Sequence, residues 1–232
     1  MELILKGLSR ALDMLTSADP ELVTILWLSL KVSVGAVVLA LAIGLPIGTW
    51  LALGRFRGQK LLVALANAGM GLPPVVVGLT VAVLLWRSGP LGSWSLLYTP
   101  TAMVLAQLVI ALPIVIALTI SAIQSLDPRI RLEAMSLGAS TIQMVSVLWR
   151  EARLGIMAAA MAGFGGAISE VGAVLMVGGN IRGQTRVMTT AIVTETRMGH
   201  FDIAIALGIL LLLLVFLANL VLTYLQQRQR YD

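Results

Sequence analysis

Long apolar stretches, separated by short polar connections, make up most of this chain. An α-helix rises about 1.5 Å per residue, so about 20 consecutive apolar residues are needed to cross the hydrocarbon core of a bilayer. Stretches of this length predict five membrane-spanning helices, at residues 22–53, 61–86, 101–123, 155–177 and 203–225. The pattern therefore predicts an all-α integral membrane protein with five transmembrane helices.

The segment before the first span, residues 1–21, has a different pattern. Its leucines recur every three or four residues, at Leu5, Leu8, Leu12 and Leu15. This spacing predicts a short amphipathic helix, which lies either at the external membrane interface or against its own bundle. Acidic residues interrupt the segment, so it lacks the continuous apolar core of a signal peptide. The chain thus divides into this helix and one transmembrane domain, residues 22–232.

Prolines interrupt several of the predicted spans. Pro46 and Pro113 lie within the first and third spans, and Pro73-Pro74 lies in the middle of the second. The Pro73-Pro74 pair removes two backbone donors and predicts a break or sharp kink. Carbonyl groups freed at membrane depth need cover from protein or from a wet cavity. The prolines fit either a structural kink or a transport pathway, and we favour the pathway because a simple membrane anchor needs no broken helices.

Composition and charge support a membrane location and give an orientation. The 232 residues are 59% hydrophobic and 12% charged, which is too apolar for a soluble domain of this length. The net charge is +5, but the basic residues form short clusters beside the spans rather than a nucleic-acid-binding patch. In a five-span topology, residues 55–60, the connection at 124–153 and the C-terminal tail share one side. The positive-inside rule predicts that this side is cytoplasmic, so the N-terminus is outside and the C-terminus is cytoplasmic.

Few residues in this chain could carry out catalysis. The chain has no cysteine and one histidine, which argues against a thiolate or histidine metal site and against a catalytic triad. Glu170 is the only acidic residue within a predicted span. A membrane enzyme is therefore a disfavoured alternative, and we expect no catalytic and no metal-binding residue.

The connection at residues 124–153 is too polar to be embedded in the membrane. After a helix-start signal, we expect Glu133 and Ala134 in the first turn of a helix, where a carboxylate suits the helix dipole. Gly138 and Ala139 provide a place with almost no side chain, where another chain can approach closely. The alternative is an ordinary amphipathic surface helix.

This connection resembles the cytoplasmic loop in permease subunits of ATP-binding-cassette (ABC) importers. That loop reads Glu-Ala-Ala, three residues, Gly, and then a stretch leading to Ile-x-Leu-Pro. Glu133-Ala134 and Gly138-Ala139 match its first part, whereas Met135 and the run Leu148-Trp149-Arg150-Glu151 depart from it. The resemblance implies the type I ABC importer permease fold, in which the loop forms a cytoplasmic coupling helix that docks on a separate ATPase subunit.

The same resemblance implies the partners and the contact residues. Glu133, Ala134, Gly138 and Ala139 would contact the ATPase. The chain has no Gly-x-x-x-x-Gly-Lys-Ser/Thr phosphate loop, so the partner ATPase would bind the ATP and magnesium, and this chain would hold no cofactor. One copy offers half a pathway and one docking loop. A second copy and two ATPase subunits are therefore expected, in a prokaryotic plasma (inner) membrane.

Residues near the last two spans resemble a narrower group. Ser169–Ala173, Gly178–Ile181, Thr185 and Ala191-Ile192 are similar to a segment of sulfate and molybdate importer permeases, and the full run is most like tungstate-type permeases. This implies import of an oxyanion, most simply tungstate, that an extracellular binding protein hands over. A permease for molybdate or sulfate is an alternative. So is a stand-alone secondary transporter, although the two halves of the chain show no inverted repeat.

We expect the pathway or gate in this region, at Ser169, Glu170, Asn180, Thr185, Thr189 and Thr190. Hydrogen-bond donors at an outer mouth suit a tetrahedral oxyanion, and they suit contact with a binding protein equally well. A carboxylate at membrane depth costs about 2.5–3.5 kcal/mol, so Glu170 should be paired, wet or functional. Whether Lys31 pairs with Glu170 or extends to the membrane surface stays open. Small residues on the helical face of Glu170 predict close helix packing: Ala159, Gly163, Gly166 and Ala173.

Overall fold

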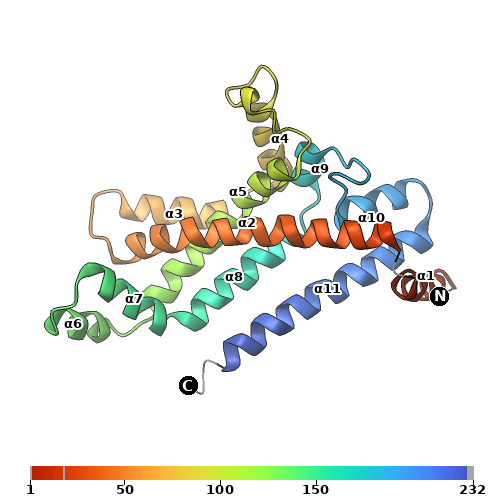
Figure 1. The fold of residues 1–232 in the computed structure, drawn as a ribbon. Coiled ribbons are helices and arrows are strands. Elements are labelled where there is room, and N and C mark those ends of the chain that lie inside the picture. Colours follow the sequence, from red (N-terminus) through yellow and green to blue (C-terminus); the bar gives the residue numbers. More distant parts are fainter. Residues whose placement is uncertain (1, 18, 229–232) are drawn as a thin grey trace.

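The computed structural model describes residues 2–17 and 19–228, and every regular element in these residues is a helix (Figure 1). In chain order the helices are α1 (Glu2–Thr16), α2 (Pro20–Leu53), α3 (Gln59–Gly69), α4 (Pro74–Leu85), the 3-10 helix η1 (Gly92–Trp94), α5 (Pro100–Gln124), α6 (Pro128–Ser136), α7 (Thr141–Glu151), α8 (Arg153–Ile168), α9 (Gly172–Gly178), α10 (Met188–Arg197) and α11 (Phe201–Arg228).

Three of the described helices, α2, α5 and α11, are each long and apolar enough to cross a membrane, and the count rises to five if each of two bent pairs forms one span. These five units coincide with the five predicted stretches. Side chains cap the N-termini of two of the long helices. Asp19 accepts hydrogen bonds from the backbone N–H groups of Glu21 and Leu22, and Thr99 accepts one from Ala102. Helix α2 continues through Pro46 as one element of 34 residues.

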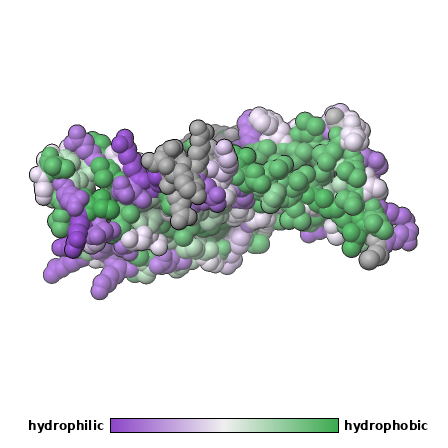
Figure 2. Space-filling model, turned by 90° about the horizontal axis from the view of Figure 1, so that it is seen from below, coloured by the Kyte–Doolittle hydropathy of each residue, from purple (hydrophilic) through white to green (hydrophobic). Residues whose placement is uncertain are grey.

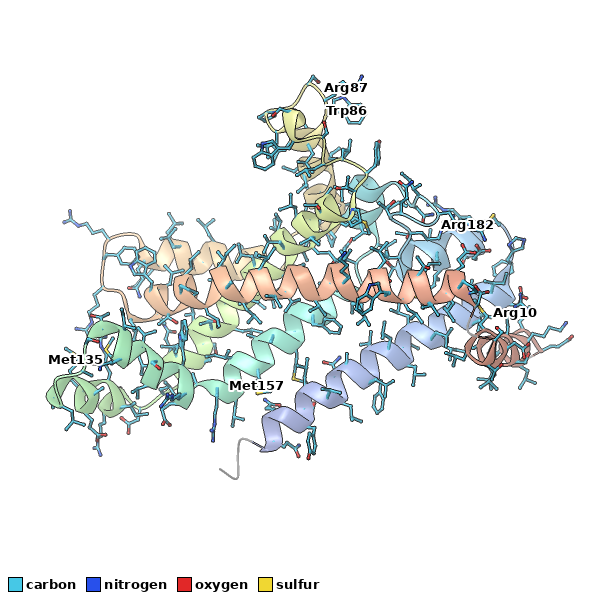
Figure 3. The ribbon with its side chains drawn as sticks, in the orientation of Figure 1. Arg10, Trp86, Arg87, Met135, Met157 and Arg182 are labelled. Carbon is cyan, nitrogen blue, oxygen red and sulfur yellow. The ribbon has the colours of Figure 1, made fainter. Side chains whose placement is uncertain are left out.

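The second span is broken where the sequence predicts it. Helices α3 and α4 meet at an angle of 102°, and Pro74 is the first residue of α4. Proline suits a first helical position because that residue needs no backbone donor. Helix α4 therefore turns away from the direction of α3 and packs against α9 and α5. Its far end projects from the bundle (Figure 1) and leads to Trp86 and Arg87 (Figure 3).

The fourth span is also broken, and the prediction of one helix over residues 155–177 is wrong. Helices α8 and α9 are bent by 60° at residues 169–171. Glycines at 165, 166 and 172 flank the bend, and glycine is a weak helix former. The predicted common face of Ala159, Gly163, Gly166 and Ala173 with Glu170 is therefore not one helical face, since Ala173 belongs to α9.

Glycines bring the central helices unusually close together. A Cβ atom built on Gly44 would stand 2.8 Å from Cγ1 of Val115, and one on Gly48 would stand 2.7 Å from Cβ of Thr119. Gly155 of α8 meets Ala122 of α5 in the same way, at 2.5 Å from its Cβ. Small residues permit such contact between helices in lipid. Helices α2, α5 and α8 thus pack as a tight unit.

Helices α1 and α4 pack through glycine as well. A Cβ on Gly78 of α4 would stand 3.1 Å from Cβ of Ala173 in α9 and closer still to its backbone, while a Cβ on Gly7 of α1 would stand 2.7 Å from Cβ of Ile205 in α11. The bundle-contact alternative for the N-terminal helix is therefore confirmed for one face of α1. The opposite face keeps the four periodic leucines exposed.

The surface separates into apolar and polar regions. Seen from below, a broad hydrophobic area lies over α11, where Leu212, Phe216 and Leu220 are exposed (Figure 2). Hydrophilic side chains gather at the end that carries α6 (Figure 2). This distribution agrees with a membrane-embedded bundle and an α6 that lies in water.

Candidate functional site

Helices α6 and α7 form a compact helix–turn–helix at one end of the molecule. Oδ1 of Asp127 accepts a hydrogen bond from the backbone N–H of Arg129 at 2.9 Å and so caps α6. The backbone N–H of Ala139 donates to the carbonyl of Ala134 at 3.0 Å across a left-handed Gly138 with φ +78°, the geometry of a Schellman turn. Ser140 and Gln143 then form a capping box for α7. The turn is therefore locally well determined.

The residues predicted to contact an ATPase occupy different environments in this turn. Glu133 is exposed but lies in the last turn of α6, so its predicted place in the first turn is wrong; the helix starts at Pro128 and Glu133 is five residues further on. Gly138 is exposed, and a Cβ there would meet nothing within 4 Å. Ala139 is half-buried and Ala134 is buried. The contact itself stays a prediction, and in it Ala134 would hold α6 against α7 rather than touch a partner.

Apolar side chains surround these residues on the outside of the turn. Leu137 is 88% and Ile142 is 83% exposed, and Leu132 and Met135 are also exposed. A cavity of about 450 Å³ lies beside α6 and is lined by Arg129, Leu132, Glu133, Ser136 and Leu137. Exposed leucine and isoleucine next to charged residues are typical of a surface that binds another protein. Sequence reasoning missed these apolar residues, although their exposure follows from the polar surroundings of the segment.

Glu170 lies in the break between α8 and α9 and holds the two ends of the break in place. It is 93% buried, because its exposed fraction is 7%. Its Oε1 accepts a hydrogen bond from the backbone N–H of Ala173 at 2.8 Å. Its carbonyl oxygen accepts one from Oγ1 of Thr189 in α10, also at 2.8 Å. Lys31 is exposed and forms no ion pair with Glu170, both of which belong to the described residues.

The other predicted pathway residues mostly use their polar groups within the protein. Thr185 is fully buried, and its hydroxyl donates to the carbonyl of Gly178 at 2.5 Å and accepts from the N–H of Ile181 at 2.9 Å. The hydroxyl of Thr190 donates to the carbonyl of Val187 at 3.0 Å. These threonines therefore shape the segment between α9 and α10 in this structure and do not offer free donors.

Two further predicted residues differ in their surroundings. Asn180 adopts a left-handed conformation with φ +52°, and its amide nitrogen donates to Oγ1 of Thr194 at 2.7 Å. Ser169 is exposed at the end of α8, and its hydroxyl donates to the carbonyl of Gly165 at 2.7 Å. The structure thus brings Glu170 and Thr189 together directly, whereas Ser169 and Asn180 occupy separate positions around the break. The part of all six in a pathway stays a prediction.

An ion-pair cluster at the end of the molecule opposite α6 joins the segment between α9 and α10 to α2. Glu21 accepts hydrogen bonds from Nε of Arg182 at 2.7 Å and from its Nη2, and it pairs with Nη1 of Arg186 at 3.4 Å. The hydrogen bond to Glu21, and then the negative charge of Glu21, raise the pKa of the Arg182 guanidinium above its ordinary value. Figure 3 shows Arg182 and Arg10 at this end and Met135 at the other.

A cavity of about 420 Å³ adjoins the cluster between α1, α2, α10 and α11. Its lining includes Arg10, and also Glu195, whose Oε2 lies 2.9 Å from Nδ1 of His200. The sequence pattern did not identify Glu21 as the partner of Arg182 and Arg186. The partners are more than 150 positions apart, and no local pattern joins them.

The comparison with known families decides the identity of this fold. Residues 44–231 match the family described as "Binding-protein-dependent transport system inner membrane component". The chain belongs to this family. The permease is 41% identical over 227 residues to the tungstate uptake system permease protein TupB of Peptoclostridium acidaminophilum, which covers 98% of this chain and 100% of that one.

Two further comparisons agree. The permease is 45% identical over 203 residues to a probable anion ABC transporter permease protein of Haloferax volcanii, covering 85% of this chain and 88% of that one. Its fold is similar to that of a chain in inward-facing structures of the MetNI methionine ABC transporter, with a TM-score of 0.70 at 17% identity, covering 90% and 95% of the two chains. The predicted resemblance to ABC importer permeases and the predicted permease fold are therefore confirmed. The chain is a multi-pass permease of a binding-protein-dependent transport system.

Proposed function

We propose that this permease is the transmembrane subunit of an ABC importer that takes up tungstate from an extracellular binding protein. The observation that carries the substrate is the 41% identity, along 98% of the chain, to a tungstate uptake permease. The run from Ser169 to Ile192, which led to the same substrate from sequence, lies in the structure around the α8–α9 break and the segment that follows it.

The ATPase partner, which binds ATP and magnesium, docks on the α6–α7 turn and so couples ATP hydrolysis to the permease. The exposed Leu132, Leu137 and Ile142, together with the open position at Gly138, supply an apolar face that an ATPase groove can cover. This end is cytoplasmic. The Glu21–Arg182 cluster and the N-terminus are then outside, as the positive-inside rule predicts.

Two copies of the permease and two ATPase subunits form the working assembly. One chain exposes one docking turn, and Ser169 at the end of α8 is exposed, next to a Gly165 on which a Cβ would meet nothing within 4 Å. The anion passes between the two copies. The α3–α4 and α8–α9 breaks place helix ends within the membrane, which is where transporters build pathways from discontinuous helices.

A permease for molybdate or sulfate is the second candidate. All three anions are tetrahedral and accept hydrogen bonds on every oxygen, so hydrogen bonding alone does not separate them. Selection among them belongs mainly to the binding protein. A stand-alone secondary transporter fits less well, since it gives the exposed α6–α7 turn nothing to bind.

The test is reconstitution of the permease with its ATPase and binding protein in liposomes. Uptake of tungstate, molybdate and sulfate is measured by elemental analysis at equal concentrations, with ATP and with a non-hydrolysable analogue. We expect ATP-dependent uptake of tungstate that an equal concentration of sulfate does not reduce. Preferential uptake of molybdate or sulfate would refute the substrate. Uptake that is independent of ATP and of the ATPase subunit would refute the importer.

A further inference from the structure

A hydrogen bond joins α7 directly to α2 near the proposed coupling end. The indole Nε1–H of Trp149 donates to Oγ1 of Thr49 at 2.8 Å, across 100 positions of sequence. Thr49 is 97% buried, because its exposed fraction is 3%. Its hydroxyl proton is committed to the carbonyl of Leu45 at 2.7 Å. The Thr49 oxygen therefore presents a fixed lone pair to the indole, so the bond has one preferred geometry.

The other contacts at this place are apolar. A buried cluster joins the ends of α5, α6, α7 and α8, with the end of α2 packed against it: Ala122, Ile123, Ala134, Met144, Leu148 and Ala152. Apolar contacts are not directional, so helices that share them can slide against one another. The bond between Trp149 and Thr49 is directional and sits at the rim of this cluster. It fixes the register between α7 and α2.

A displacement of α2 at Thr49 is passed on to α5. Gly48, the neighbour of Thr49, packs against Thr119 so closely that a side chain would not fit, and Gly44 packs against Val115 in the same way one turn earlier. Tightly packed helices of this kind move together rather than deform. Helix α8 follows α7 with only Ala152 between them. Movement of α7 thus reaches the unit of α2, α5 and α8 by two routes, the covalent link to α8 and the bond from Trp149 to α2.

We infer that Trp149 is a positioning residue for energy coupling, which makes the tightly packed unit of α2, α5 and α8 move with the α6–α7 turn when that turn is displaced by its ATPase. This inference rests on the proposed function. It gives a role to the run Leu148-Trp149-Arg150-Glu151, where the chain departs from the Ile-x-Leu-Pro ending of the general ABC permease loop. Neither phenylalanine nor leucine could replace the indole donor.

The test uses variants that remove each partner of the bond with little change in shape. Trp149→Phe removes the donor, Thr49→Val removes the acceptor, and the double variant removes both. Thr49→Ser keeps the hydroxyl and serves as the conservative rescue. Trp27→Phe is the matched control, because Trp27 is an exposed tryptophan of α2 with no hydrogen bond to its indole among the described residues. The readout is ATP hydrolysed per anion imported in liposomes, with co-purification of the ATPase and the melting temperature measured in parallel.

We expect Trp149→Phe and Thr49→Val each to raise ATP hydrolysed per anion by about three- to tenfold, the effect of one lost hydrogen bond. The double variant should be no worse than the worse single variant, because both lose the same bond. Thr49→Ser and Trp27→Phe should match the wild type, and the ATPase should still co-purify. A purely structural role would lower the yield and melting temperature of Trp149→Phe and leave the ratio in the surviving protein unchanged.

Two results would overturn the inference: an unchanged ratio in both single variants, or single losses that multiply in the double variant. Should Trp149→Phe fail to fold, Thr49→Val carries the test alone. Failure of the proposed function is a separate result, since it appears as the absence of ATP-dependent uptake in the wild type. An active wild type with unaffected variants refutes the role of Trp149 alone.

Discussion

The crossing of α4 and α9 makes a sharp prediction about a single methyl group. In Gly78→Ala, the new Cβ would stand 3.1 Å from Cβ of Ala173, 3.2 Å from its carbonyl oxygen and closer still to its Cα. Backbone atoms cannot move aside as the end of a flexible side chain can, so α4 and α9 must separate. Overpacking of this kind costs about 1–3 kcal/mol.

The matched control is Gly35→Ala in α2. The new Cβ there would lie 3.7 Å from Val104, which is an ordinary van der Waals contact. Both substitutions replace a helical glycine by alanine, and each gains about 1 kcal/mol of helix propensity. The difference between the two variants therefore isolates the overpacking term. For a chain of this size, 1 kcal/mol corresponds to roughly 2–4 °C, so Gly78→Ala should melt about 2–12 °C below Gly35→Ala.

The assay is the apparent melting temperature of both purified variants in the same detergent, at the same heating rate. Transport activity is recorded as well, because α4 and α9 border the proposed pathway. Equal melting temperatures for the two variants would show that α4 and α9 do not pack through Gly78. A Gly35→Ala variant that melts lower than Gly78→Ala would refute the packing argument altogether.

Three further predictions concern other parts of the molecule. Gly138→Arg should abolish ATP-coupled uptake and ATPase co-purification, while Gly199→Arg, at another exposed left-handed glycine of φ +83°, should retain both; loss in both variants would point to misfolding instead. Glu21→Gln should speed tryptic cleavage in the segment between α9 and α10. High salt should do the same to the wild type, because salt screens exposed charge pairs. Equal cleavage rates in the variant and the wild type would show that the ion pairs do not restrain the segment. Thr189→Val removes a buried hydrogen bond to the α8–α9 break and should lower the stability by about 0.5–1.5 kcal/mol. Its melting temperature should be lower than that of the control Thr196→Val, whose hydroxyl makes an exposed hydrogen bond. Identical melting temperatures would contradict the role of the Thr189 bond.

Features that depend on neighbouring residues could be predicted from the sequence. Five apolar stretches locate the spans because their length is set by the bilayer, and Pro73-Pro74 locates the α3–α4 break because proline acts on its own backbone. The position of Glu133 could also be predicted correctly. The helix-start signal at Asp127-Pro128 puts Glu133 five residues after the helix start, beyond the first turn.

Features that depend on distant residues could not be predicted in this way. The bend between α8 and α9 is held by Thr189 of α10, which bonds to the carbonyl of Glu170. Glu21 finds its arginine partners only because the bundle folds the α9–α10 segment over the start of α2. For the predicted pathway threonines, residue type alone indicated donors, and their internal hydrogen bonds became visible only with the fold.

Helix α2 carries both Thr49, which bonds to Trp149, and Glu21, which pairs with the α9–α10 segment. The two residues are 28 positions apart on one uninterrupted helix, or about 42 Å along its axis. The two ends of the molecule are therefore joined by one continuous helix, which includes neither of the broken spans. If a shift at Thr49 changes the equilibrium at Glu21, thermodynamic reciprocity requires that an event at Glu21 changes the equilibrium at Thr49 by the same free energy. An event at the Glu21 end and an event at the Thr49 end are then coupled through α2 by equal free energies in both directions.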